Sequence, residues 1–141
     1  MRVTGLRSAA AGLSLALLSC GGDSFSPTVE NVAGTYAAST FTIKSSAGTV
    51  DLLDLGAIAA ITLAPDGTTT GQLFVPGGGD NGGDLDEDLT GTWILDGSTV
   101  TFTQTADTFL PDVQFAAGRN SLTGEENFSG QTIRLVLTKT Q

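Results

Sequence analysis

Short segments of alternating apolar and polar residues run through most of this chain, and the clearest pattern lies at residues 89–104. Two runs rich in β-branched and aromatic residues are separated there by Asp96-Gly97, a dipeptide typical of tight hairpin turns. Val100 and Phe102 alternate with threonines in the second run, which gives it one apolar face. The pattern predicts a β-hairpin that buries Trp93, the only tryptophan of the chain.

The same period recurs on both sides of this hairpin. A change of face near Ser39-Thr40 predicts a bulge in the first strand, and residues 51–55 suit either one helical turn or a loop that closes an end of the fold. The further predicted strands are Gly34–Lys44, Ala57–Leu63, Thr68–Val75, Val113–Ala116, Ser121–Phe128 and Thr132–Lys139.

These segments predict an all-β protein with about eight short strands, joined mostly by short antiparallel connections. No stretch is long enough for a substantial helix. A small antiparallel up-and-down barrel is the favoured architecture because closure removes unpaired strand edges, and a β-sandwich is the alternative.

The first twenty residues have the layout of an export signal. Arg2 and Arg7 precede the ten-residue apolar run Ala9–Leu18, which is shorter than the roughly 20 residues of a transmembrane helix. The run ends in Leu17-Leu18-Ser19-Cys20, which resembles the lipobox of bacterial lipoproteins. The resemblance implies cleavage before Cys20, a diacylglyceryl group on its sulfur, and anchoring to a membrane of the cell envelope. The outer membrane is favoured if the source has two membranes, because glycine rather than aspartate follows the cysteine.

The sequence therefore divides into a signal peptide (residues 1–19), a lipidated cysteine with a flexible tether (20–33) and a barrel domain (34–141). The tether is predicted from its small polar residues and Pro27.

Three short motifs resemble the lipocalin-like domains of small bacterial lipoproteins over about residues 32–141. They are Gly34-Thr35-Tyr36, the apolar strand and turn at residues 61–68, and Gly91-Thr92-Trp93. Tyr36 stands where the family has tryptophan, and the sequence offers no evident arginine to stack on it. The resemblance implies a closed barrel whose interior either is filled by side chains or holds a small apolar ligand.

The candidate ligand-binding residues are the large side chains expected to face inward: Tyr36, Phe41, Ile61, Leu73, Trp93, Phe102, Phe115 and Leu135. Together with Leu63, Leu95, Ile133 and Leu137 they are numerous enough to fill the interior, whereas nearby alanines and Gly71 leave room. Two hypotheses follow. The domain binds a small apolar ligand, or it is a structural or interaction lipoprotein with a filled barrel that meets another envelope protein. In either case we expect a monomer.

Charge and composition limit the chemistry. The net charge of −9 argues against nucleic acid as a partner. The chain has no histidine, and Lys44 and Lys139 lie in no Ser-x-x-Lys arrangement, so we expect neither an enzyme nor a cofactor.

The acidic segment at residues 76–88 is rich in glycine and carries five carboxylates, which predicts a mobile, solvated loop. Calcium binding through Asp80, Asp84, Asp86 and Asp88 is the weighed alternative. The spacing does not fit an EF-hand loop, whose sixth position is glycine, since counting from Asp84 that position is Leu89.

Overall fold

The computed structural model describes residues 25–140, so the predicted signal peptide and Cys20 lie outside the described residues. The predicted hairpin is present as β6 (Gly91–Asp96) and β7 (Thr99–Gln104). Trp93 pairs with Phe102 across it, and both side chains are buried. The alternation seen in the sequence thus places one face of the hairpin in the core.

Eight strands close into an antiparallel barrel, as predicted, and two further strands extend it. Going around the barrel the order is β10, β9, β8, β7, β6, β4, β3 and β1, and pairing of β1 with β10 closes the ring. The remaining strands are β1 (Gly34–Ser45), β2 (Gly48–Asp51), β3 (Ile58–Leu63), β4 (Thr68–Val75), β5 (Leu85–Asp88), β8 (Phe115–Ala117), β9 (Ser121–Phe128) and β10 (Gln131–Lys139).

The two strands outside the ring were not predicted. β2 pairs with the end of β1, and β5 pairs with the second half of β4. The predicted bulge is present, because the register of β1 against β10 shifts between Ala38 and Thr40. That shift changes the face of the strand, so that both Tyr36 and Phe41 are buried.

Helical structure is limited to single turns in the described residues. The α-helical turn is α1 (Val29–Val32), and the 3-10 turns are η2 (Leu53–Leu55), η3 (Asp80–Gly82) and η4 (Leu110–Asp112). Of the two alternatives that the sequence leaves for residues 51–55, a helical turn or a loop, the helical turn is present as η2. Among residues 25–140, no helix is long and apolar enough to cross a membrane.

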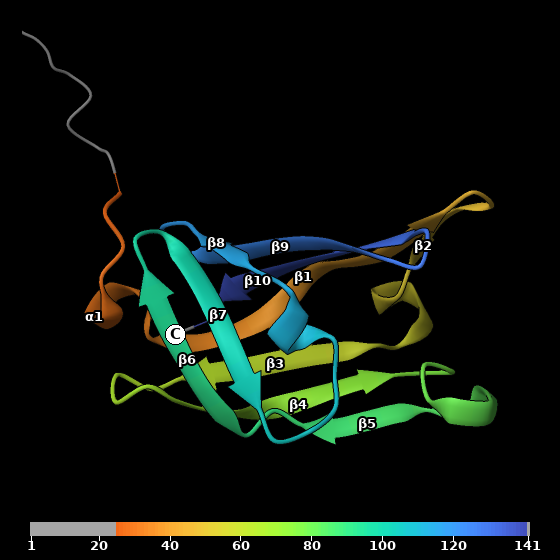
Figure 1. Cartoon of the computed structure of the whole chain (residues 1–141), viewed down its shortest axis with the longest axis horizontal. Helices are drawn as coiled ribbons and strands as arrows, with labels where there is room; N and C mark the ends of the chain where they lie inside the picture. Colours follow the sequence, from red (N-terminus) through yellow and green to blue (C-terminus); the bar gives the residue numbers. More distant parts are fainter. Residues whose placement is uncertain (1–24, 141) are drawn as a thin grey trace, which may run out of the picture.

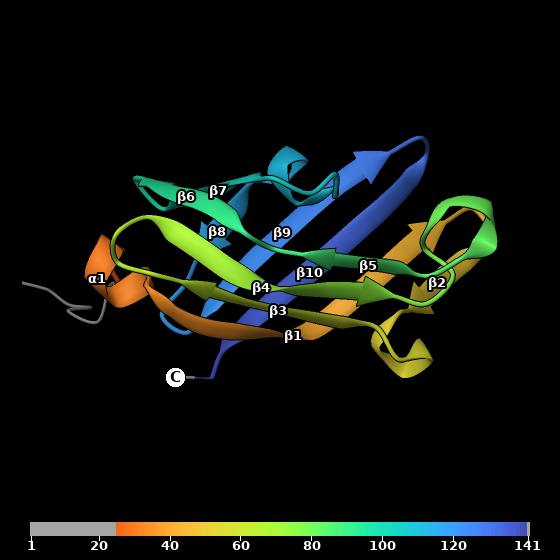
Figure 2. The same cartoon turned by 90° about the horizontal axis from the view of Figure 1, so that it is seen from below.

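The barrel has two distinct ends (Figures 1 and 2). We call one the α1 end; it holds α1 and the turns at residues 64–67, 97–98 and 118–120. We call the other the open end; it is formed by the connections at residues 52–57, 76–84, 105–114 and 129–130. The connections between barrel strands at the α1 end are all short turns, whereas the open end also has the three longer connections that contain the 3-10 turns.

Candidate functional site

All eight interior residues predicted as ligand contacts are buried in one hydrophobic core. Each is at most 3% exposed, and the rings of Phe102 and Phe115 meet edge to face with their centroids 5.3 Å apart. These side chains belong to one packed core that extends through the barrel from the α1 end to the open end. Of the eight, Phe41 also reaches a pocket at the open end, and Trp93 borders a shallow groove at the α1 end.

The α1 end is closed by polar contacts. The Tyr36 hydroxyl donates a hydrogen bond of 2.6 Å to the carbonyl of Val32, and burial raises the pKa of Tyr36 above its ordinary value. The ammonium of Lys139 donates to the carbonyl of Asn31 at 2.6 Å and lies 5.7 Å from the centre of the Tyr36 ring. Lys139 thus supplies the cation over the first-strand aromatic residue for which the sequence offered no arginine.

The chain before β1 differs from the predicted flexible tether in its described part. Thr28 and Asn31 form a reciprocal capping box that starts α1, and Val32 is 1% exposed against the core. Residues 28–33 are therefore part of the folded domain. The physical reason is that a cap satisfies the first amides of the turn while an apolar side chain is buried, which offsets the cost of ordering the segment.

Trp93 is also held at the α1 end by a hydrogen bond. Its indole nitrogen donates to the carbonyl of Ala64 at 2.8 Å, so the ring is fixed against the turn between β3 and β4. In that turn Asp66 accepts hydrogen bonds from the hydroxyl and the amide of Thr68, which lower the pKa of Asp66. The α1 end is therefore fixed by side chains bonded to backbone carbonyls.

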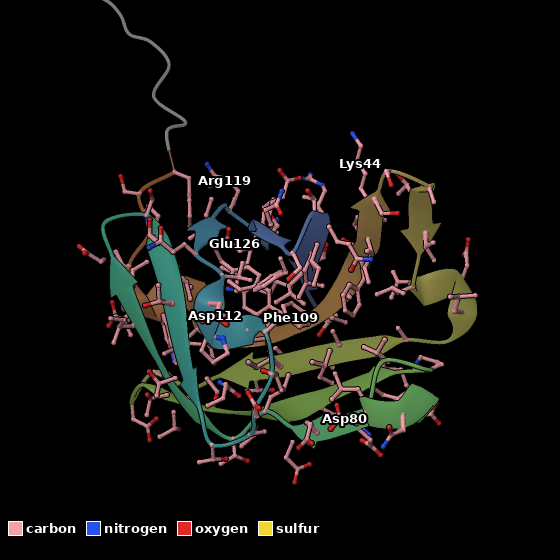
Figure 3. All side chains as sticks on the ribbon, turned by 45° about the vertical axis from the view of Figure 1, so that its right-hand side comes forward. Lys44, Asp80, Phe109, Asp112, Arg119 and Glu126 are labelled. Atoms are coloured by element: carbon pink, nitrogen blue, oxygen red, sulfur yellow. The ribbon has the colours of Figure 1, made fainter. Side chains whose placement is uncertain are left out.

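The open end contains an apolar pocket of about 130 Å³, which we call the open-end pocket. Its lining comes from β1, β4, β5, β10 and the connections between strands, and it is Phe41, Ile43, Leu52, Val75, Gly78, Leu85, Phe109 and Ile133. Figure 3 looks toward this end and shows Phe109 near its centre. None of these eight lining residues in the described part of the chain is charged.

Phe109 is positioned by its own connection. It precedes η4, whose turn is closed by a hydrogen bond from the Asp112 amide to the Phe109 carbonyl. The Phe109 ring lies 5.8 Å from that of Phe41 and 6.4 Å from that of Phe128, measured between centroids. Phe109 is half-buried. It packs against the core from the side of the open end and partly covers the pocket that it lines.

An acidic groove of about 610 Å³ adjoins the pocket. It shares Gly78, Leu85 and Phe109 with the open-end pocket. Its carboxylates come from the connection between β4 and β5, from β5 itself and from the connection after β7, and they are Asp80, Asp84, Asp86, Glu87 and Asp107. An apolar site and an anionic surface therefore meet at one edge.

Residues 76–88 differ from the mobile loop that the sequence predicts, because they contain η3 and β5. β6 pairs with β4 only at Thr68 and Thr69, which leaves the second half of β4 to pair with β5. Strand pairing satisfies backbone groups that would otherwise lie unpaired along this edge. Asp84 stabilises the connection further by accepting a hydrogen bond of 3.0 Å from the amide of Gly77.

These carboxylates do not converge on a point. Asp86 accepts a hydrogen bond from the Gln72 side chain at 3.0 Å, and within residues 25–140 no three acidic, cysteine or histidine side chains gather in a group able to hold a metal ion. The four aspartates weighed as calcium ligands thus lie along a connection and a strand instead of forming a cage.

Sequence reasoning missed most of the pocket lining. Phe109 lies in a segment interpreted as a short link, although the adjacent apolar residues Phe109 and Leu110 were a usable signal. Leu85 is the single apolar residue of β5, so the sequence has no alternation of apolar and polar residues there that would predict a strand. The chain matches no protein-family model, and neither a curated protein nor a solved structure has significant similarity to it.

Proposed function

We propose that this chain is a lipid-anchored protein of the bacterial cell envelope whose lipocalin-like barrel binds a compact apolar group of a ligand at its open end. The observation that carries the proposal is the open-end pocket, whose volume is about 130 Å³ and whose lining is apolar. An apolar protein cavity of roughly 150 Å³ stays dry and binds benzene. The pocket therefore suits one ring or a short branched alkyl group.

The anchoring part rests on the sequence. The chain has the features expected of the export signal of an acylated protein: a basic start, a ten-residue apolar run and the lipobox-like Leu17-Leu18-Ser19-Cys20. More than one acyl chain makes such an anchor stable, whereas one chain is marginal.

The position of the pocket suits this anchoring. Phe25, the first described residue, follows Cys20 by five residues and precedes α1. Five residues extend to about 17 Å at most. An anchor on Cys20 would keep the α1 end near the bilayer and leave the open end facing away from it, where a ligand has access.

The filled interior favours a second candidate, a structural or interaction lipoprotein without a small ligand. The eight predicted interior residues are buried against one another, so the middle of the barrel is not the proposed binding site. The two candidates differ at the open end, where only the first requires a ligand beneath Phe109.

Anchoring is tested by expressing the full chain in a bacterium supplied with labelled palmitate. The wild-type chain should take up label and partition into detergent, and Cys20→Ser should do neither. An unlabelled wild type would end this part of the proposal.

Ligand binding is tested with the chain as purified, held in phosphatidylcholine nanodiscs and labelled at its isoleucine and leucine methyl groups. Titration with 2-phenylethanol should shift the methyl resonances of Ile43 and Ile133, which line the pocket, and leave that of exposed Ile94 at the α1 end unchanged. If a large excess of 2-phenylethanol shifts neither the Ile43 nor the Ile133 methyl resonance, the second candidate is favoured.

A further inference from the structure

The open-end pocket is too small to hold more than one compact group of a ligand. Its volume of about 130 Å³ is filled by a single ring. Any larger ligand must continue out of the pocket. Selectivity is then decided by the surface that the rest of the ligand meets.

That surface is the acidic groove. Gly78, Leu85 and Phe109 line both spaces, so a ligand group that leaves the pocket at this edge lies directly against the groove. The groove is several times larger than the pocket, about 610 Å³ against about 130 Å³, and it has room for a polar group with its water.

The chain around the open-end pocket and the acidic groove is strongly negative. The segments at 44–57, 76–88 and 105–114, which include β2 and β5 with the connections beside them, carry nine carboxylates and one basic residue, Lys44. The carboxylates are Asp51, Asp54, Asp80, Asp84, Asp86, Glu87, Asp88, Asp107 and Asp112. A potential of this sign attracts cations to the end of the barrel and repels anions.

We propose that the open end selects a small organic cation bearing one compact apolar group, with the apolar group in the open-end pocket and the cation in the acidic groove. The inference rests on the proposed function, since it assigns the ligand class of the same pocket. The apolar lining provides the site, and charge complementarity with its rim specifies the occupant.

Glu87 and Asp107 are the carboxylates best placed to meet the cation. Glu87 is half-buried on β5, Asp107 lies two residues before Phe109, and both line the groove. They belong to different elements, β5 and the connection after β7, and line the same groove. Asp84 and Asp86, in contrast, already accept hydrogen bonds from Gly77 and Gln72.

The test compares three ligands with the same phenyl ring: 2-phenylethylamine, a cation at pH 7, 2-phenylethanol, which is neutral, and 3-phenylpropionate, an anion. Each is titrated into the full chain in phosphatidylcholine nanodiscs at low salt, with the methyl resonances of Ile43 and Ile133 as reporters. The amine should bind about tenfold more tightly than the alcohol, and the anion most weakly. The advantage of the amine should shrink in 0.5 M salt because ions screen exposed charges.

The double variant Glu87→Gln/Asp107→Asn should remove the advantage of the amine and leave the affinity for 2-phenylethanol unchanged. The matched control is Asp96→Asn at the end of β6, beside the turn at the α1 end, which should alter neither affinity. Leu85→Phe, which fills the pocket, should weaken all three ligands while the fold, followed by circular dichroism, persists.

The outcomes separate the two proposals. Equal affinities for the amine and the alcohol, with shifts at Ile43 and Ile133, would overturn cation selection and keep the proposed function. If the amine shifts the methyl resonances of Leu85, which lines both spaces, but not those of Ile43 and Ile133, while the alcohol shifts both isoleucines, the amine binds only as a counterion and the inference is overturned. The absence of pocket shifts with all three ligands would overturn the proposed function itself.

Discussion

The α1 end and the open end of the barrel use different aromatic residues. Tyr36 and Trp93 at the α1 end each donate a hydrogen bond to a backbone carbonyl, at 2.6 Å and 2.8 Å. The rings at the open end are Phe41, Phe109 and Phe128, which have no polar group and are held by ring contacts 5.8 to 6.4 Å between centroids. A polar tip fixes one ring orientation, whereas phenylalanine contacts can be exchanged for those of a ligand ring.

The two ends also differ in charge. The connections at 25–33, 64–67, 96–98 and 118–120 of the α1 end, with the last residues of β10, carry three carboxylates against Arg119 and Lys139. The segments 44–57, 76–88 and 105–114 at and beside the open end carry nine carboxylates against Lys44. One end of the barrel is thus closed and nearly neutral, and the other holds an apolar pocket within an anionic rim.

The largest effect should come from truncating the two aromatic residues that represent the two ends. Trp93→Ala should lower the free energy of unfolding by about 3–5 kcal/mol, because a buried ring and its hydrogen bond are lost. Phe109→Ala should lower it by only about 1–2 kcal/mol, since this ring is half-buried. Urea unfolding followed by circular dichroism measures both, and equal losses would contradict the difference between the ends.

An intermediate effect is expected from adding a methyl group to glycine. A Cβ at Gly91 would overlap the backbone carbonyl of Thr103 and lie 2.9 Å from the Cα of Gln104. Gly91→Ala should therefore force β6 and β7 apart and lower the free energy of unfolding by about 1–3 kcal/mol.

The matched change at the open end is Gly83→Ala, whose Cβ would lie 3.4 Å from the carbonyl oxygen of Asp80 at a φ of −73°. It should leave the unfolding free energy nearly unchanged. A loss as large as that of Gly91→Ala would mean that the connection between β4 and β5 is packed as tightly as the hairpin.

A smaller effect than that of Gly91→Ala is expected from removing the Tyr36 hydroxyl. Tyr36→Phe should lower the free energy of unfolding by about 1 kcal/mol at pH 7, because the carbonyl of Val32 loses its donor. Burial raises the pKa of Tyr36 above 10.0, so its protonated form is favoured in the folded state. The resulting stability is complete below pH 10 and is lost as pH rises through the folded-state pKa.

The wild type should therefore lose more stability than Tyr36→Phe between pH 9 and pH 12. Tyr36 is the only tyrosine of the chain, so the ultraviolet absorbance of its phenolate reports its titration directly. A midpoint at or below 10.0 would contradict the buried, hydrogen-bonded hydroxyl.

The strands of the barrel could be predicted wherever alternation is strong. β4 and β9 have the predicted bounds, and the bulge near Ser39 follows from a change in the parity of buried residues along β1. Alternation is local, and it is visible in a sequence because each strand buries several apolar residues on one face.

β5 and the pocket could not be predicted in this way. β5 has one apolar residue, Leu85, and forms because the second half of β4 has an edge to pair with. The open-end pocket gathers residues as distant as Phe41 and Ile133, together with Phe109 from a connection that lacks strand periodicity. Such a site depends on which strand ends meet in the folded barrel, and this cannot be predicted from any single segment of the sequence.

The central claim is that a compact apolar group binds at the open end and not in the middle of the barrel or at the α1 end. Crystals of the protein pressurised with xenon test it most directly, because xenon occupies apolar cavities of this size without requiring charge or hydrogen bonds. We expect xenon density between Phe41, Leu85, Phe109 and Ile133, at the open-end pocket. Xenon bound only in the groove beside Trp93 and Ile94 at the α1 end, with none beneath Phe109, would contradict the claim.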